Sequence, residues 1–364
     1  MLNRAGETTR AQISLDEIRI IAGLFQLRTV TRAHAYNRGS ARFPKVIIET
    51  EDKVQFLLKR RIGTPANLAR VRLSHEVQLE LARKGFPTAP LMRSAADATW
   101  ILDEGCLYEM FAFIEGDRFR RSTWEARESG TMLLRLHRTL QEWHPSTPSP
   151  DHFGYHNSKS VASSWDILAR KILEVNPQAT KSKLERIIEI LRTQYNDAAA
   201  AAESVLQASA TYGHRSILHG DFHPGNILFG AGTPVVMLDF DSTRVDRTIF
   251  DIANAALQFS IPSMSQKSVS HWDATLNVQL IESFLSGYGL STEIELNAEE
   301  CGALSSLMIE ATIAETIPRI ALSGSWEGRS GIEILRFIAL RSDWILSQRE
   351  RLTKLFQQCM GHES

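Results

Sequence analysis

The segment Ser216–Asp241, SILHGDFHPGNILFGAGTPVVMLDFD, contains three carboxylates, two histidines and an asparagine between two apolar runs. Asp221 and Asn226 lie five positions apart, directly before the first apolar run, and the second run ends at Asp239. This pattern predicts a β-hairpin with acidic and amide side chains at its mouth. Two kinds of chemistry use such groups: metal-dependent hydrolysis based on the histidines, and phosphoryl transfer based on the aspartates and the asparagine.

The composition is that of an ordinary globular protein. With 364 residues, of which 43% are hydrophobic, the chain can form two domains or one two-lobed unit. A net charge of −1 gives no reason to expect a nucleic-acid or membrane partner. Three cysteines without a CxxC pair exclude a disulfide framework and a cysteine zinc site. Since no signal-like or bilayer-length apolar run occurs, we expect a soluble cytoplasmic protein, and the sequence leaves its oligomeric state open.

The first third of the chain has the pattern of a small antiparallel sheet. Ser14 and Glu17 have capping-box spacing before an apolar stripe, which predicts a short helix. Residues 27–61 alternate apolar and polar side chains between two turns, which is typical of three antiparallel strands. A helix is then expected over residues 66–85, with Gly85 as its stop, followed by two more strands.

Helical patterns dominate after Gly116. The fold class we predict is α+β with two lobes. Residues 1–115 form a β-rich N-terminal lobe with a hinge at about 110–115, and residues 116–364 form a mainly helical C-terminal lobe.

Phosphoryl transfer needs few protein groups. It requires a carboxylate that orients the acceptor hydroxyl, for which Asp221 is suited, and oxygen ligands for Mg²⁺, for which Asn226 and Asp239 are suited. The D-x-x-x-x-N interval equals that of the kinase catalytic loop, and Asp239-Phe240-Asp241 stands where kinases have D-F-G. In the third position this chain has an aspartate instead of glycine.

Several segments together resemble one family. The signature H-G-D-x-x-x-x-N is complete, LDFDSTRVDRTIFDIA resembles the segment I-D-F-(D/E)…D-(L/I)-A, and GTMLLRLH and FLSGYG resemble two further family segments. From Leu27 to Ile317 the chain resembles the aminoglycoside phosphotransferase and choline kinase superfamily, the phosphotransferase enzyme family with a protein-kinase-like fold. The resemblance implies that Asp221 is the catalytic base and that His219 braces its loop.

The same resemblance implies that Asn226 and Asp239 are Mg²⁺ ligands and that Asp251 is a structural carboxylate that ties the loop down. Three assignments stay open for Asp241: a residue that contacts a metal ligand without binding the metal itself, a second metal ligand, or a surface acid.

A nucleotide site of this kind needs a lysine on the third strand and a glutamate on the following helix that fixes it. Lys59 and Glu76 occupy these places. Strand alternation and the family pattern favour Lys59 over Arg60 and Arg61, and Glu80 is the rival of Glu76.

The remaining nucleotide contacts follow from the family pattern. Ser40, in the turn YNRGSAR, is a candidate for covering the phosphates. The adenine pocket is expected at EMFAFIEG, where Met110 forms a wall and Leu228 forms the floor. The backbone groups that would bond to the base are those of Phe111, Ala112 and Phe113. Residues 27–93 contain 14 Lys and Arg against 5 Asp and Glu, a bias that either attracts a polyphosphate or is only a solvated surface.

Other functions fit the sequence less well. A metallohydrolase would use His219, Asp221 and His223, but proline and glycine follow directly and no HExxH partner occurs. A non-catalytic nucleotide-binding regulator is a second alternative, although no essential position is missing. A bacterial protein-serine/threonine kinase of the same superfamily is a third, although no A-P-E segment follows Asp239.

The acceptor is defined only by class. Residues 244–329 contain 11 Asp and Glu against 5 Lys and Arg, and Glu310 and Glu315 lie on a helix that the family places near the acceptor. This favours a cationic hydroxyl compound such as an aminoglycoside, choline, an amino alcohol or a homoserine-like molecule, against the alternative of a solvated acidic surface. The predicted function is transfer of the γ-phosphoryl group of ATP, with GTP as the alternative donor, to a small-molecule hydroxyl.

Overall fold

The chain forms two compact units. The computed structural model describes residues 13–36, 43–149, 154–209, 215–264, 268–289 and 298–361. The first unit comprises Met1–Gly116, Pro145–Ser149 and Val236–Asp241, and the second comprises Asp117–His144, Pro150–Val235 and Ser242–Ser364. The division differs from two consecutive lobes because two short later segments belong to the first unit.

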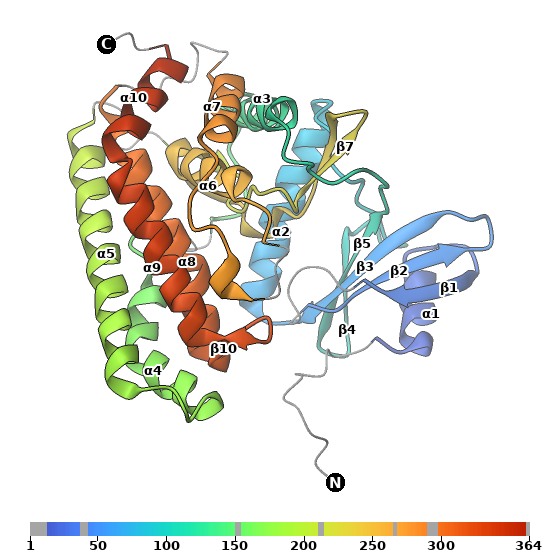
Figure 1. Ribbon diagram of the computed structural model, residues 1–364. Helices are drawn as coiled ribbons and strands as arrows, with labels where there is room; N and C mark the ends of the chain where they lie inside the picture. The colour runs from blue at the N-terminus through green and yellow to red at the C-terminus, as the bar shows by residue number, and fades with distance from the viewer. Residues whose placement is uncertain are drawn as a thin grey trace. The chain divides into compact units, whose positions relative to one another are not determined.

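The first unit contains a five-stranded antiparallel sheet in the order β1-β2-β3-β5-β4 (Figure 1). The predicted strands and helices of this region are confirmed. Their bounds are α1 (Leu15–Leu24), β1 (Val30–Ala35), β2 (Lys45–Thr50), β3 (Gln55–Ile62), α2 (Pro65–Arg83), β4 (Trp100–Asp103) and β5 (Cys106–Ala112).

The two faces of this sheet have different contents. One face packs against α1 in an apolar cluster that includes Ile21, Leu58 and Met110. The capping box predicted at the start of α1 is present: Ser14 and Glu17 exchange hydrogen bonds between side chain and backbone. Because side chains alternate along a strand, the neighbours of Leu58 and Met110, which are Lys59 and Glu109, lie on the other face.

Helix α2 has clear start and stop signals. Thr64 caps it by accepting a hydrogen bond from the N–H of Asn67, and Pro65 occupies the first turn, where no N–H partner is needed. Gly85, expected as the stop, follows the helix with φ of +73°, a conformation that glycine adopts without strain.

The second unit is mainly helical. Helices α5, α8 and α9 run side by side in it (Figure 1). Its elements are α3 (Thr123–Leu140), α4 (Lys159–Val175), α5 (Lys181–Ala208), β6 (Ser216–Leu218), β7 (Ile227–Gly230), β8 (Thr233–Met237), β9 (Arg244–Asp246), α6 (Thr248–Ser260), α7 (Val278–Tyr288), α8 (Leu304–Ser323), β10 (Ser325–Trp326), β11 (Arg329–Ser330), α9 (Gly331–Ser347) and α10 (Arg349–Cys359). The predicted hairpin is β7-β8, and β8 leads the chain from this unit into the first.

Two glycines allow helices α3 and α7 to approach closely. A Cβ atom on Gly130 would lie 2.0 Å from the carbonyl oxygen of Phe284, and one on Gly287 would lie 1.9 Å from that of Arg127. The two backbones are therefore in direct contact, so neither position accepts a side chain. Among the described residues, no helix is long and apolar enough to cross a membrane.

Candidate functional site

The loop after β6 is held by a carboxylate from the first turn of α6. Asp251 accepts hydrogen bonds from the backbone N–H groups of His219, at 2.7 Å, and Gly220, at 2.9 Å. The next N–H, that of Asp221, donates to Nδ1 of His219 at 3.3 Å. Three consecutive backbone groups are thus fixed just where Asp221 projects, and one of them is held by the side chain of His219.

Asp251 is itself supported by a buried chain of side chains. His137 on α3 donates from Nε2 to Asp251 at 3.2 Å, and the hydroxyl of Tyr288 lies 2.7 Å from Nδ1 of His137. Burial alone would raise the pKa of Asp251, but the hydrogen bond and charge of His137, with Arg244 and His219, hold that pKa below its usual value. The carboxylate therefore stays ionised and keeps its hydrogen bonds to the loop backbone.

Gly220 could not be another residue at this turn. Its φ is +80°, and a Cβ atom would lie 2.1 Å from the carbonyl oxygen of Ser242. Both the conformation and the close approach require glycine, which explains the glycine of the H-G-D signature in physical terms.

Asp221 and Asn226 sit at the two ends of the turn that precedes β7. The side chain of Asp221 is 47% exposed. Asn226 is buried, and its Nδ2 group donates to the carbonyl oxygen of Asp221 at 2.9 Å. The asparagine amide therefore ties the turn together, and its oxygen is the atom that could bind a metal ion.

The first unit contains a charge cluster formed by Lys45, Lys59, Arg61, Glu109, Asp239 and Asp241. Asp239 accepts from Nζ of Lys45 at 3.1 Å and from Nζ of Lys59 at 3.2 Å, one lysine on each oxygen. Asp241 accepts hydrogen bonds from both Lys59 and Arg61. The strand register places Lys45 on β2 and Glu109 on β5 directly opposite Lys59 on β3.

The buried charges of this cluster stabilise one another. Burial disfavours the ammonium of Lys59, but Asp239 and Asp241 raise the pKa of Lys59 above its usual value. Burial likewise acts against the charge of Asp239, while Lys59 and Lys45 hold the pKa of Asp239 well below its usual range. Asp239 also has φ of +60°, an uncommon conformation for a residue with a side chain.

A second pair completes the cluster. Nε of Arg61 donates to Glu109 at 2.9 Å, and Nε2 of His75 on α2 lies 3.4 Å from the same carboxylate. Burial raises the pKa of Glu109, but Arg61 and His75 outweigh this effect and lower it below its usual value. The cluster is thus a continuous set of acidic and basic side chains on the sheet face opposite α1.

The structure does not join Lys59 to Glu76. The carboxylate of Glu76 accepts hydrogen bonds from the backbone N–H groups of Ser146 and Thr147, the latter at 3.0 Å. The carboxylates that contact Lys59 are those of Asp239 and Asp241, so the assignment of Asp241 as a surface acid is wrong.

Some of the residues expected around adenine are placed differently in the structure. Met110 is completely buried in the apolar cluster with α1. Because side chains alternate along a strand, Met110 lies on the sheet face opposite Lys59 and its partner Glu109. The N–H groups of Ala112 and Phe113 donate to Pro90 and Gln55, at 2.9 and 3.0 Å, so they are already satisfied within the protein.

Two of the three remaining expected residues are placed by the structure. Phe111 is partly buried, forms a ring contact with His75 and shares the Lys59 face of the sheet. Leu228 is buried in β7. Ser40 lies outside the described residues.

Two members of the cluster were missed by the sequence reasoning. Glu109 could have been noticed as a charged residue in the middle of the apolar strand CLYEMFA. Lys45 gave a weaker signal, since it stands at the very start of β2 and only the register reveals that it faces Lys59.

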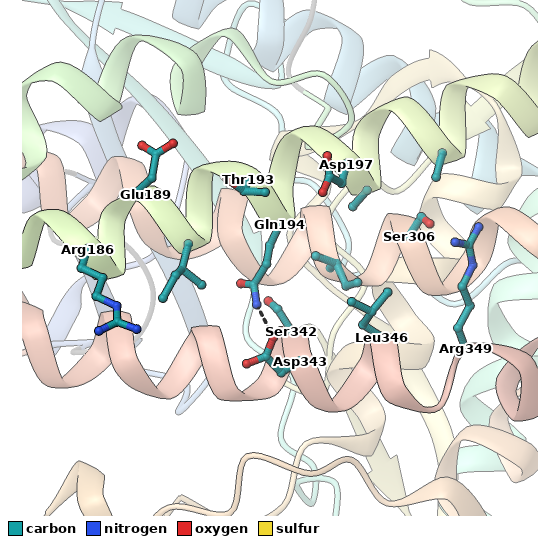
Figure 2. Close-up of a pocket in the computed structure, with 14 residues that line it drawn as sticks. Arg186, Glu189, Thr193, Gln194, Asp197, Ser306, Ser342, Asp343, Leu346 and Arg349 are labelled. Atoms are coloured by element: carbon teal, nitrogen blue, oxygen red, sulfur yellow. Dashed lines mark hydrogen bonds between the residues drawn. The ribbon is translucent and has the colours of Figure 1, made fainter.

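A separate groove runs along the second unit. It has a volume of about 570 Å³ and lies between α5, α8 and α9 (Figure 2). Gln194 crosses it to donate to Asp343 at 2.6 Å. None of the predicted site residues lines this groove. Among the described residues, no group of three or more His, Cys, Asp or Glu side chains is arranged to hold a metal ion.

Comparisons with known proteins show the family and the fold of the chain. Residues 35–296 match the family described as Phosphotransferase enzyme family, whereas no curated protein matches the chain by sequence. Among solved structures, an amicoumacin kinase in complex with AMP-PNP, Ca²⁺ and Ami is 13% identical, with a TM-score of 0.65 and coverage of 90% of this chain and 93% of that chain.

Two other solved structures are similar in fold. An aminoglycoside phosphotransferase from Alicyclobacillus acidocaldarius is 14% identical, with a TM-score of 0.60 and coverage of 96% and 99%. A choline kinase from Cryptosporidium parvum Iowa II is 13% identical, with a TM-score of 0.56 and coverage of 90% and 91%. These likenesses confirm the predicted α+β fold, with its antiparallel N-terminal sheet and helical C-terminal part, as protein-kinase-like.

Proposed function

Because the chain belongs to the phosphotransferase enzyme family, and so acts on hydroxyl groups, we propose that it transfers the γ-phosphoryl group of ATP to a hydroxyl of a small molecule. The observation that carries this proposal is the loop from His219 to Asn226. Asp251 fixes its backbone, and it presents one partly exposed carboxylate, that of Asp221.

Asp221 is the group that orients the acceptor. Its carboxylate accepts a hydrogen bond from the acceptor hydroxyl and takes the proton as the new oxygen–phosphorus bond forms. The bond between the γ-phosphorus and its bridging oxygen breaks at the same time, and ADP leaves with that oxygen. Because the backbone on both sides of Asp221 is fixed before the acceptor binds, little reorganisation is needed at the moment of reaction.

The nucleotide and its metal ion use other groups. Lys59, joined by Lys45 on the neighbouring strand, supplies positive charge for the phosphates. The amide oxygen of Asn226 and the carboxylate of Asp239 are hard oxygen donors that suit Mg²⁺, and the ion would neutralise the charge of the transferred group. The AMP-PNP and Ca²⁺ bound to the amicoumacin kinase support a nucleotide and a divalent ion as cofactors.

The acceptor we propose is an amine-bearing hydroxyl compound. The acidic excess of residues 244–329 and the names of the similar kinases support this class. Glu310 is not the group that recognises it, because it is buried and accepts hydrogen bonds from His156 and from the N–H of Asn157. Glu315 is partly buried and accepts from Gln258 at 2.5 Å, so it remains a candidate.

The decisive experiment pairs two variants in an assay of ADP release against a panel of hydroxyl compounds and aminoglycosides. Asp221→Asn is expected to keep Mg·ATP affinity but to lower turnover by about 10²- to 10⁴-fold, as loss of a general base does. Asp239→Ala is expected to weaken Mg·ATP binding itself. The exposed Asp166→Asn on α4 serves as the control. Full activity of Asp221→Asn with a working acceptor would contradict the proposal.

A further inference from the structure

The surroundings of Lys59 raise the question of which residue positions it. Its side chain is only 4% exposed, so its charge is costly unless carboxylates stay close to it. In the proposed reaction Asp239, which contacts Lys59 here, binds the metal ion instead of the lysine. A second carboxylate is therefore needed to hold Lys59 while the nucleotide is bound.

Asp241 is placed to be that carboxylate. It bonds to Lys59 and to Arg61, and Arg61 is held in turn by Glu109 on the adjacent strand. The side chains of Arg61 and Glu109 are 2% and 1% exposed, so this support is buried and cannot easily rearrange. Asp239, in contrast, accepts hydrogen bonds from the flexible ends of two lysine side chains.

Helix α2 offers no such partner through Glu76. Both oxygens of its carboxylate are engaged by the backbone of residues 146 and 147. That contact ties the short segment Pro145–Ser149 to α2 within the first unit, which is a structural task separate from Lys59.

We infer that Asp241, anchored by Arg61 and Glu109, is the residue that positions Lys59 for the nucleotide phosphates, in place of a glutamate on helix α2. The inference rests on the proposed function for the presence of a nucleotide. It makes Asp241 a positioning residue and not a metal ligand.

A binding experiment on the full chain separates these assignments. ADP is titrated calorimetrically in the presence of EDTA, and Mg·AMP-PNP is titrated over a range of Mg²⁺ concentrations. Asp241→Asn is expected to weaken metal-free ADP binding by about tenfold or more, the usual effect of losing a charged hydrogen bond, with an unchanged Mg²⁺ dependence. Glu76→Gln is the matched control and is expected to bind ADP within about twofold of the natural chain.

Kinetics and a conservative variant supply the readouts that a merely structural effect would not produce. For Asp241→Asn we expect a higher KM for ATP with little change in kcat, and Asp241→Glu should recover part of the affinity. Where Asp241→Asn does not fold, Arg61→Lys carries the same test, because a lysine cannot hold Asp241 and Glu109 together.

Other outcomes overturn the inference. If Asp241→Asn binds metal-free ADP normally but needs more Mg²⁺, Asp241 is a metal ligand. If Glu76→Gln loses affinity and Asp241→Asn does not, the helix glutamate positions Lys59 after all. If the natural chain binds no nucleotide under either condition, the proposed function itself fails, and this result is distinguishable from the other two.

Discussion

The Asp251-braced loop of the second unit and the charge cluster of the first unit each depend on a carboxylate, buried in the case of Asp251 and partly buried in the case of Asp239, but the two carboxylates accept hydrogen bonds from different donors. Asp251 is held by two backbone N–H groups and a buried histidine. Asp239 is held by the side-chain ammonium groups of Lys45 and Lys59. Backbone donors cannot leave without unfolding the turn, whereas lysine side chains can swing to another anion.

This difference teaches that each unit holds its carboxylate for a different task. Asp251 fixes the loop backbone, whose geometry should be the same with and without ligand. Asp239 neutralises two lysines, which an incoming metal–nucleotide complex can bind in its place. We therefore expect substitutions of the groups that fix the loop backbone, Asp251 and Gly220, to damage the fold first, and substitutions in the cluster to damage ligand binding first.

The largest effect is expected from Asp251→Asn. Removing the buried charge leaves His137 and the two N–H groups poorly paired, so the free energy of unfolding should fall by about 3–5 kcal/mol in urea denaturation at neutral pH. Because the pKa of Asp251 is lowered by folding, its contribution is present above its unfolded pKa of about 3.9 and is lost as the pH falls through the folded pKa. The two proteins should converge in acid, and Asp166→Asn should change nothing.

A smaller but substantial loss is expected from Gly220→Ala. A positive φ and a Cβ contact at 2.1 Å should cost about 2–3 kcal/mol of stability and lower turnover, because the backbone beside Asp221 must shift. Gly302→Ala is the control, since a Cβ there meets nothing within 4 Å. Thermal unfolding compares the two, and equal melting temperatures would show that the turn is not rigid.

The smallest effect on stability is expected in the charge cluster. Lys45→Met keeps the apolar part of the side chain and leaves Asp239 with Lys59, so the free energy of unfolding should change by no more than about 1 kcal/mol. Mg·ATP affinity, measured by calorimetry, should fall more clearly than stability does. Lys53→Met, which removes an exposed lysine in the turn between β2 and β3, is the control. A stability loss as large as that of Asp251→Asn would break the comparison.

Most of the first unit could be predicted from sequence because its signals are local. The capping box of Ser14 and Glu17, the strand alternation and the glycine after α2 each act within a few residues. The loop with Asp221 and Asn226 could be predicted for the same reason, because both residues belong to one short D-x-x-x-x-N motif.

Side-chain partners could not be predicted in this way. Whether Glu76 meets Lys59 depends on the rotation of α2 and on competition from the backbone of residues 146–147, which are distant in sequence. The direction of Met110 depends on a shift of one residue in strand register. Register also decides that Lys45 and Glu109 share a face with Lys59, so these neighbours appear only once the sheet is assembled.

The segment Val236–Asp241 has a consequence for anyone who divides this protein. It is bonded to the first unit through the N–H of Met237 and the carbonyl of Pro87, although it follows more than a hundred residues of the second unit. A fragment cut after Gly116 would lose both Asp239 and Asp241. Lys45, Lys59 and Arg61 would then be neighbouring cations without these two carboxylates. Expression of that fragment alone should give a poorly folded product unless the six-residue segment is grafted back.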